Sequence, residues 1–202
     1  MKVSRCVFVS TSEAYGGKPL KPVQEDAPLK PVGVYAAHKL LCEQLCLEGV
    51  LAGGVPSAVA RLSMVRGKGY CSHKPFFSLL DRVAEGRPVI LASLGTSHSD
   101  MVHLDDANSG LAQAAKKPNA VGEVLHFSAS IPASHVDLAR TAICCTGSRS
   151  RIVIVSPALE RVIGMLAIGL RVYDFPRDQL QYLLQNFVLD NTKASRLFGY
   201  AR

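Results

Sequence analysis

A tyrosine and a lysine stand four positions apart in the segment Tyr35-Ala36-Ala37-His38-Lys39. On a helix, positions i and i+4 share one face, so the phenol and the ammonium group would lie side by side. A positive charge beside a phenol favours the phenolate and lowers the tyrosine pKa from its reference value of about 10 toward neutrality. Such a tyrosine can exchange a proton with a substrate hydroxyl near pH 7. The same spacing also arises by chance on exposed amphipathic helices, so the pair needs support from its surroundings.

Hydroxyl and carboxylate groups precede this pair, in the segment Ser10-Thr11-Ser12-Glu13-Ala14-Tyr15-Gly16. The segment follows Arg5-Cys6-Val7-Phe8-Val9, a continuous β-rich run that is typical of a strand buried on both faces of a parallel sheet. Open α/β sheets bind ligands at the carboxyl ends of their strands. A proline-rich loop then leads to the helix that carries Tyr35. Thr11 and Glu13 are therefore candidates for the same site as Tyr35 and Lys39.

Strands and helices alternate along the chain. We expect strands over residues 5–10, 57–62, 88–91, 123–127, 152–155 and 186–189. We expect helices over 34–51, 76–85, 136–145, 157–170 and 192–197, and one that ends at 116 and is capped by Asp105 or Asp106. Ser134-x-x-Asp137 resembles a capping box for the helix over 136–145. The alternation predicts an α/β protein with a mostly parallel sheet, in which 5–10, 57–62 and 123–127 are the convincing core strands.

The composition is that of a globular protein: of 202 residues, 48% are hydrophobic and 19% are charged. It argues against a disordered chain, a collagen-like repeat or a coiled coil. The longest uncharged apolar run, residues 162–170, is too short to span a bilayer, and we expect no signal peptide or transmembrane segment. The net charge of +7 comes from scattered basic residues without an aromatic-interleaved stripe. We therefore expect a basic surface that aids solubility and no nucleic-acid partner.

The cysteines lack the spacing of a disulfide framework or of a zinc site. Cys6 lies in the first apolar strand, and Cys42 and Cys46 lie on the helix of Tyr35. We expect reduced, mostly buried thiols in the cytoplasm or another reducing compartment. No paired ligand spacing supports a metal site either, so structural roles are the favoured interpretation for His73, His98 and His103 beside Cys71 or Asp105.

Several motifs, taken together and in chain order, resemble a known family. They are Ser10–Gly16, Pro22–Pro28, Tyr35-x-x-x-Lys39, Arg61–Gly67, Asp100–Asp106 and Asp190–Tyr200. The set resembles the extended short-chain dehydrogenases/reductases, and within them the NAD-dependent epimerase/dehydratase branch that acts on nucleotide sugars. The resemblance covers nearly the whole chain. It implies the C-terminal part of a doubly wound Rossmann-type parallel sheet plus a small α/β substrate-binding portion.

The resemblance also implies roles for individual residues. Tyr35 would be the acid/base, and Lys39 its electrostatic partner and a ribose contact. Thr11 would hydrogen-bond the reacting oxygen, and Glu13 falls where dehydratase-like members place an acid/base carboxylate. The residues that would contact the NAD or NADP cofactor are Tyr35, Lys39, Ser10 and Ser63. The implied reaction is hydride transfer from a sugar carbon to the cofactor, which gives a transient ketone.

The implied organisation has two parts. Residues 1–70 would form a partial Rossmann-type portion with the active-site helix. Residues 71–202 would be mainly the substrate-binding portion, with strand 123–127 returning to the main sheet. The expected partners are a small-molecule substrate such as a nucleotide sugar and, in a homodimer, a second copy of the chain.

The main departure from the family pattern is that no G-x-x-G-x-x-G or G-x-G-x-x-G turn follows a strand. Such a turn holds the cofactor pyrophosphate at a helix N-terminus. We therefore expect the chain to begin at the fifth strand of the family's sheet. Two consequences follow: the strand over residues 6–10 would be an exposed apolar edge, and this chain alone would bind NAD weakly or not at all.

Two further departures concern the substrate. Met64 stands where nucleotide-sugar members usually carry an asparagine, and Ser99 where many carry an arginine. Both suit hydroxysteroid-dehydrogenase-like relatives that oxidise an apolar alcohol, which is one alternative. Another is a non-catalytic, truncated or decayed family member that acts only through association with a partner. RNA binding by a basic relative of the fold is a third, weaker alternative.

Overall fold

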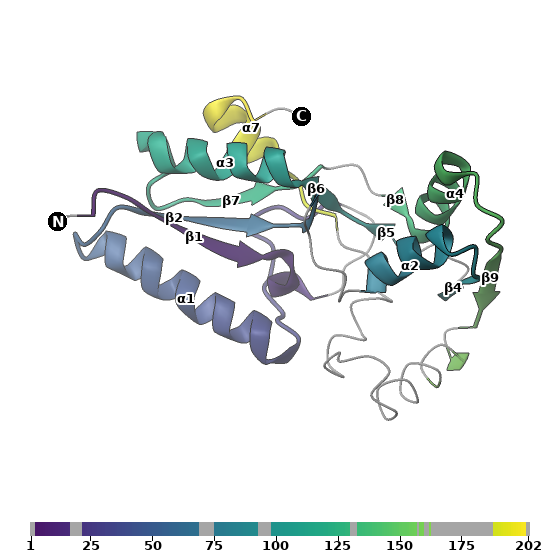
Figure 1. Cartoon of the computed structure of the whole chain (residues 1–202). Helices are drawn as coiled ribbons and strands as arrows, with labels where there is room; N and C mark the ends of the chain where they lie inside the picture. The colour runs from purple at the N-terminus through teal and green to yellow at the C-terminus, as the bar shows by residue number, and fades with distance from the viewer. Residues whose placement is uncertain are drawn as a thin grey trace. The chain divides into compact units, whose positions relative to one another are not determined.

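The computed structural model describes residues 3–16, 22–68, 75–92, 98–129, 133–156, 158–159, 162 and 188–200. The chain divides into two compact units (Figure 1). Unit 1 comprises residues 1–68, 100–132 and 187–202, and unit 2 comprises residues 69–99 and 133–186. Most of the helix expected over 157–170 lies outside the described residues.

Unit 1 is built on a parallel sheet of three strands, in the order β1-β2-β7. These are β1 (Cys6–Thr11), β2 (Ser57–Leu62) and β7 (Val124–Phe127). They are the three strands that the sequence predicts as the core, and the α/β class with parallel pairing is confirmed. Within the described ranges, no strand pairs with the outer side of β1, so β1 is an edge strand as expected.

Helices cover both faces of this sheet (Figure 1). The helix α1 (Gly33–Leu51) runs along one face, and α3 (Leu104–Lys116) lies on the other. A third helix, α7 (Thr192–Phe198), packs beside β7. Because successive side chains of a strand point to opposite faces, β1 and β2 each contribute one set of side chains to α1 and the other set to α3.

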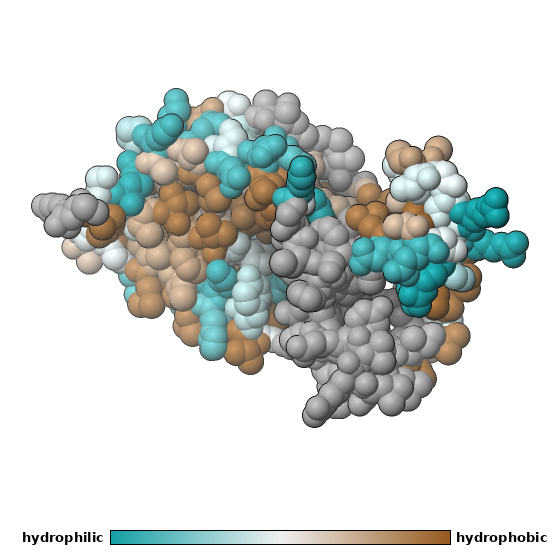
Figure 2. All heavy atoms as spheres, viewed as in Figure 1, coloured by the Kyte–Doolittle hydropathy of each residue, from teal (hydrophilic) through white to brown (hydrophobic). Residues whose placement is uncertain are grey.

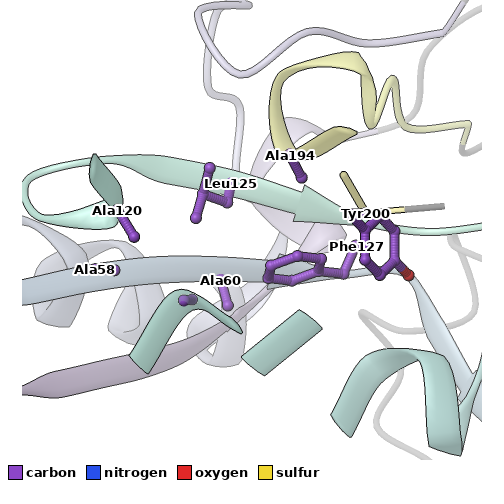
Figure 3. Packing of buried hydrophobic residues seen from close by; sticks show 8 residues of the cluster. Ala58, Ala60, Ala120, Leu125, Phe127, Ala194 and Tyr200 are labelled. Atoms are coloured by element: carbon purple, nitrogen blue, oxygen red, sulfur yellow. The ribbon is translucent and has the colours of Figure 1, made fainter. Parts of the chain in front are cut away.

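The face toward α3 and α7 holds the apolar core (Figure 3). Alanines of β2 leave space for larger side chains of β7, and the ring of Phe127 packs edge-on against that of Tyr200 with centroids 5.0 Å apart. The approach of α3 depends on Gly110, because a Cβ at this position would lie 2.6 Å from Cδ1 of Phe127. A residue without a side chain is therefore required where α3 crosses the ring.

Shorter elements complete unit 1. They are the 3-10 helices η1 (Ser12–Tyr15) and η3 (Pro118–Ala120) and the parallel pair β3 (Met64–Arg66) and β6 (Met101–His103). Of the strand expected over 186–189, residues 186 and 187 lie outside the described residues, and Leu189 forms an isolated β-bridge with Val23.

Unit 2 has its own small core. The helices α2 (Pro75–Ala84) and α4 (His135–Thr146) pack together near the parallel pair β4 (Val89–Ala92) and β9 (Ile152–Val155). An antiparallel pair joins β5 (His98–Ser99) to β8 (Ala133–Ser134). Ser134 caps α4 by accepting a hydrogen bond from the backbone N–H of Asp137 at 3.1 Å, so the predicted cap is confirmed.

The cap of α3 differs from the expectation. The helix begins at Leu104, and its N-cap is His103, whose Nδ1 accepts a hydrogen bond from the backbone N–H of Asp105 at 3.3 Å. Asp105 and Asp106 therefore occupy the first turn, where their charges favour the positive end of the helix dipole.

The expectation of mostly buried thiols is wrong for the described cysteines. Cys6, Cys42, Cys144 and Cys145 are exposed, and Cys46 is half-buried. The reason for Cys42 is that α1 carries apolar side chains all round, so their spacing does not reveal its outer face. Leu41 and Leu45 lie on that face and are 56% and 69% exposed. Figure 2 shows hydrophobic side chains on this part of the surface.

None of the helices in the described part of the chain is long and apolar enough to cross a bilayer.

Candidate functional site

Tyr35 and Lys39 lie on successive turns of α1, beside the carboxyl end of β1. The Lys39 ammonium donates a hydrogen bond to the backbone carbonyl of Val9 at 2.9 Å. Its Nζ lies 5.1 Å from the ring centre of Phe8 and 5.7 Å from that of Tyr35. Tyr35 is 47% exposed. The structure thus holds a cation next to a phenol that a ligand from solvent can reach.

Thr11 and Glu13 shape the turn that follows β1. The buried Thr11 is the N-cap of η1, and its Oγ1 accepts a hydrogen bond from the backbone N–H of Glu13 at 3.2 Å. The chain then returns toward α1, where the backbone N–H of Lys30 donates to the carbonyl of Ala14 at 2.9 Å. The end of β1, η1 and the start of α1 therefore meet at one end of the sheet.

The two serines proposed as cofactor contacts have different environments. Ser10 is buried, and its hydroxyl is hydrogen-bonded to Oε1 of Glu43. Ser63, between β2 and β3, donates its backbone N–H to the carbonyl of Phe127 at 3.1 Å. The Ser63 hydroxyl is buried, and within the described ranges it has no hydrogen-bond partner. Ser10 is thus engaged inside the protein, whereas Ser63 keeps a hydroxyl that a ligand group could satisfy.

A buried ion pair, which sequence reasoning missed, anchors the helix of Tyr35 and Lys39. Arg61 on β2 places Nη2 2.6 Å from Oε2 of Glu43, and its Nε lies 3.0 and 3.2 Å from the two carboxylate oxygens. Glu43 is one helical turn beyond Lys39, so Tyr35, Lys39 and Glu43 share the face toward the sheet. The available signal was an arginine inside an apolar strand, because a buried charge needs a partner.

The ion pair continues into a chain of hydrogen bonds. The Nη1 group of Arg61 donates to the Tyr15 hydroxyl and, at 3.2 Å, to the backbone carbonyl of Glu25. Tyr15 Oη lies 2.6 Å from His126 Nε2, and His126 Nδ1 lies 3.0 Å from the carbonyl of Asp190. Because a carbonyl only accepts, Nδ1 carries the proton and Nε2 accepts from the tyrosine. The chain therefore ties η1, β2 and β7 to the C-terminal segment.

The pKa values of Tyr15 and His126 suit this chain of hydrogen bonds to positioning side chains rather than to transferring protons. Burial raises the pKa of Tyr15 to about 12. Burial also lowers the pKa of His126 to about 4, and the nearby Arg61 charge contributes to this. Both side chains are therefore neutral near pH 7. The contact of 3.8 Å between His126 Nδ1 and Glu25 Oε1 is then not an ion pair.

Asp100 holds the C-terminal segment by a second contact. Its Oδ2 accepts a hydrogen bond from the backbone N–H of Leu189 at 2.8 Å. Burial raises the pKa of Asp100 to about 6. Leu189 is also the residue that bridges Val23. Asp100, the first residue of the Asp100–Asp106 motif, thus ties the C-terminal segment to the rest of unit 1.

The surroundings of Met64 are less polar than a site for a nucleotide sugar would require. Met64 on β3 is the register partner of Met101 on β6. The sulfur atoms of both contact the Arg66 guanidinium, that of Met101 at 3.4 Å from Nε. The side chain of Ser99 lies outside the described part. Among the described residues, no three His, Cys, Asp or Glu side chains form a group that could hold a metal ion.

Comparison with known proteins points in one direction. Residues 1–129 match the sequence model of the NAD dependent epimerase/dehydratase family. Over 128 residues the chain is 29% identical to YtcB of Bacillus subtilis, described as an uncharacterized UDP-glucose epimerase. The match covers 63% of this chain and 40% of that protein. Over 120 residues it is 31% identical to a UDP-glucose 4-epimerase of Azospirillum brasilense. This match covers 52% of this chain and 34% of that protein.

Solved structures share the fold. The UDP-glucuronic acid 4-epimerase of Bacillus cereus, in complex with UDP-glucuronic acid and NAD, superposes with a TM-score of 0.77 at 24% identity, over 100% of this chain and 57% of that one. The dTDP-glucose 4,6-dehydratase of Bacillus anthracis, in complex with NAD, superposes with a TM-score of 0.74 at 21% identity, over 95% of this chain and 54% of that one. The chain thus spans about half the length of these structures.

Proposed function

Because this chain belongs to the NAD-dependent epimerase/dehydratase family, we propose that the site in unit 1 carries out NAD-dependent oxidation and reduction of a nucleotide sugar, with Tyr35 as its acid/base. The observation that carries the proposal is the position of the Lys39 ammonium group. Its ammonium is fixed to the Val9 carbonyl while it lies one helical turn from Tyr35. The two relatives that are named as UDP-glucose epimerases support the choice of substrate class.

The chain's own residues manage the proton. Tyr35, as phenolate, accepts the proton of the sugar hydroxyl and later returns it to the carbonyl oxygen. The Lys39 charge stabilises the phenolate, and because an ammonium has three N–H groups, two remain for a ribose or the phenolate after the bond to Val9. The Thr11 hydroxyl would donate to the reacting oxygen, and Glu13 would serve proton transfer in a dehydration. The nicotinamide cofactor, when bound, accepts and returns the hydride.

The residues present fit the nicotinamide-ribose half of that cofactor. Lys39, Tyr35 and the buried hydroxyl of Ser63 supply donors in unit 1. The 202 residues contain no G-x-x-G-x-x-G or G-x-G-x-x-G motif, the pattern whose turn would hold the pyrophosphate. We therefore expect weak binding, with a dissociation constant on the order of a millimolar, which corresponds to about 4 kcal/mol of binding free energy.

A binding experiment tests the cofactor part. NAD and nicotinamide mononucleotide are titrated separately into the chain, and the shifts of backbone amide resonances are followed by NMR. We expect both ligands to bind with similar weak affinity and to shift residues of β1 and the start of α1. Lys39→Met should abolish both titrations, whereas Lys116→Met, which removes an exposed lysine from the end of α3, should leave them unchanged. A micromolar constant for NAD would contradict this account.

An activity experiment tests the chemistry. The chain is incubated with millimolar NAD and UDP-glucose, and the sugar is examined by NMR for a 4-keto product or the C4 epimer. We expect slow turnover that Tyr35→Phe abolishes, with only a partial loss of cofactor binding because Lys39 and Ser63 remain. If cofactor binds and no nucleotide sugar reacts, the non-catalytic alternative is favoured instead.

A second candidate substrate class rests on Met64 and Met101. The paired thioethers offer an apolar surface beside Arg66, where an amide side chain would suit a nucleotide sugar better. An apolar secondary alcohol, as in hydroxysteroid-dehydrogenase-like oxidation, would use the same Tyr35 and Lys39. Turnover of sterols without turnover of UDP-glucose would favour this alternative.

A further inference from the structure

Three cysteines occur on the two elements that carry the proposed active site. Cys6 is the first residue of β1, and Cys42 and Cys46 lie one turn apart on α1. All three are free thiols; Cys6 and Cys42 are exposed, and Cys46 is half-buried. None of them takes part in the hydrogen-bonded chain around Arg61, and the proposed function uses none of them.

The side chain of Cys6 points toward α1. The hydroxyl of Ser10 is bonded to Glu43 of α1, and the ring of Phe8 lies beneath the Lys39 ammonium of the same helix. Side chains two residues apart on a strand share a face of the sheet. Cys6, two residues before Phe8, therefore lies on the face that α1 covers.

The helix runs antiparallel to β1, so its C-terminal half passes Cys6. At the far end of α1, Cγ1 of Val50 lies 3.9 Å from the position of a Cβ on Gly122. The backbone N–H of Gly122 donates to the carbonyl of Ser57 at 2.8 Å, and Ser57 is the register partner of Cys6. Figure 1 shows this course of α1 along β1.

Distances along the two elements bring Cys46 near Cys6. The Lys39 ammonium reaches the Val9 carbonyl at 2.9 Å, which fixes one point where helix and strand meet. From Lys39 to Cys46 the helix rises about 10 Å. From Val9 back to Cys6 the strand also extends about 10 Å. Lys39 and Cys46 are seven residues apart and share a helix face. The Cys46 thiol therefore lies on the side of α1 that faces β1, between the level of Ser10, which Glu43 contacts, and that of Cys6.

Electrostatics agree with this placement. Burial raises the pKa of the Cys46 thiol, and the nearby charges of the Cys6 and Cys42 thiolates and of Glu43 raise it further. These groups are therefore close enough to interact. The i, i+4 pair on the helix is less suited to a disulfide, because its Cβ atoms are about 5–6 Å apart, whereas a disulfide needs about 3.5–4.5 Å.

We propose that Cys6 and Cys46 are a thiol-modification site that a small-molecule disulfide such as oxidised glutathione converts into a cross-link between β1 and α1. The Cys6 thiolate attacks one sulfur of the oxidant, the oxidant's S–S bond breaks, and one glutathione thiolate leaves with the electron pair. Cys46, which loses its proton to solvent, attacks the Cys6 sulfur and displaces the second glutathione. The protein is oxidised by two electrons, and one glutathione disulfide is reduced to two thiols.

The cross-link would bear on the proposed active site without using its residues. Lys39 and Cys46 lie on one stripe of α1, and Val9 and Cys6 lie on one strand. A bond between Cys6 and Cys46 would fix the position of the helix along β1 two turns beyond Lys39. Formation of the bond is measured independently of cofactor binding or turnover, so failure of one proposal leaves the other to be judged by its own experiment.

The experiment maps the disulfide in the full chain. The native protein, dilute enough to disfavour links between molecules, is incubated with oxidised glutathione, and the remaining thiols are alkylated at low pH. Digestion after Lys39, Glu43 and Glu48 puts Cys42 and Cys46 on different peptides, and digestion after Glu13 or Lys18 separates Cys6 from both. We expect mass spectrometry to show the peptide of Cys6 joined to that of Cys46, and dithiothreitol to reverse the link.

Matched variants complete the test. Cys46→Ser should abolish the intramolecular link to Cys6, whereas Cys42→Ser and Cys145→Ser should retain it. In guanidinium chloride the selectivity for this pair should disappear, since the fold no longer aligns the two thiols. A link between Cys42 and Cys46, links between molecules only, or glutathione adducts without any internal link would overturn the proposal.

Discussion

Glu43 and Arg61 form an ion pair in the interior of unit 1, with Arg61 Nη2 2.6 Å from Glu43 Oε2 and both side chains 4% exposed. The pair joins α1 to β2, and it does so from the helix face that also carries Tyr35 and Lys39. Breaking a buried pair leaves one charge without compensation, which costs far more than the pair contributes relative to an apolar one. The placement of the proposed acid/base therefore depends on a contact two helical turns away.

Glu43→Gln tests this dependence. We expect the free energy of unfolding to fall by about 3 kcal/mol, because the Arg61 charge stays buried beside a neutral amide. Urea denaturation followed by circular dichroism measures the change. The control is Glu123→Gln, which removes the pair between Glu123 and Lys193 at 2.7 Å in the same unit. Since those side chains are 39% and 29% exposed, the control should cost less than about 1 kcal/mol. Equal losses of unfolding free energy in the two variants would contradict the importance given to the buried Glu43–Arg61 pair.

Asp100 and His126 give the stability of unit 1 two opposing dependences on pH. Burial raises the pKa of Asp100 from 3.8 to about 6, so its contribution to stability is present below pH 3.8 and is lost as the pH rises through 6. Burial lowers the pKa of His126 from 6.5 to about 4, so its contribution is present above pH 6.5 and is lost as the pH falls through 4. Each effect is about 3 kcal/mol, and the two offset each other between pH 4 and 6.

Single variants separate the two dependences. In Asp100→Asn the stability should rise with pH between 4 and 6.5, because only the histidine effect remains in that window. In His126→Gln it should fall with pH between 3.8 and 6. Chemical denaturation at closely spaced pH values gives both slopes. Parallel curves for the two variants would show that the pKa values of these buried groups do not differ between the folded and unfolded states.

Two glycines on helices of unit 1 should respond oppositely to the same substitution. A Cβ at Gly110 would lie 2.6 Å from Cδ1 of Phe127, whereas a Cβ at Gly49 of α1 would meet nothing within 4 Å. Gly110→Ala should destabilise by about 1–3 kcal/mol through overpacking. Gly49→Ala should stabilise by about 0.5–1 kcal/mol through helix propensity. Thermal unfolding of both variants measures the contrast, and destabilisation by Gly49→Ala would refute it.

Thr11 has a structural role that can be distinguished from its proposed catalytic one. Its Oγ1 accepts from the Glu13 backbone N–H at 3.2 Å. Thr11→Val should therefore lower the free energy of unfolding by about 1 kcal/mol, the usual cost of a lost cap, and Thr11→Ser should keep most of it. A serine variant as unstable as the valine variant would contradict the role of the cap, because the hydroxyl that it keeps would then not preserve stability.

The sequence was sufficient for the elements that position the site. The apolar runs of β1 and β2, the long helix up to Leu51 and the cap at Ser134 could all be recognised because the relevant signals are local. The edge position of β1 also followed from the sequence, because the family resemblance placed strand 5–10 at the end of the part of the sheet that the chain contains.

The sequence was insufficient where partners lie far apart along the chain. Glu43 looks like a solvent-facing residue on a helix, and only the fold shows that it faces Arg61. His126 within β7 and Tyr15 within the loop motif likewise gain their contact from packing. The exposure of Cys42 was missed for the opposite reason: an apolar helix does not indicate which of its sides is left to solvent.

The bond between Lys39 and Val9 has a consequence for the open border of β1. Because the backbone N–H of Cys6 points to Pro56 beside β2, the peptide groups of Val7 and Val9 point away from the sheet. The Lys39 ammonium thus donates to the Val9 carbonyl, a backbone acceptor to which an added extended chain would otherwise donate. Pairing of such a chain along the whole edge of β1 would displace the ammonium from the Val9 carbonyl and leave all its N–H groups for Tyr35 or a bound ligand. Pairing at this edge and the hydrogen bonds available to the proposed acid/base Tyr35 would therefore be coupled through one carbonyl oxygen.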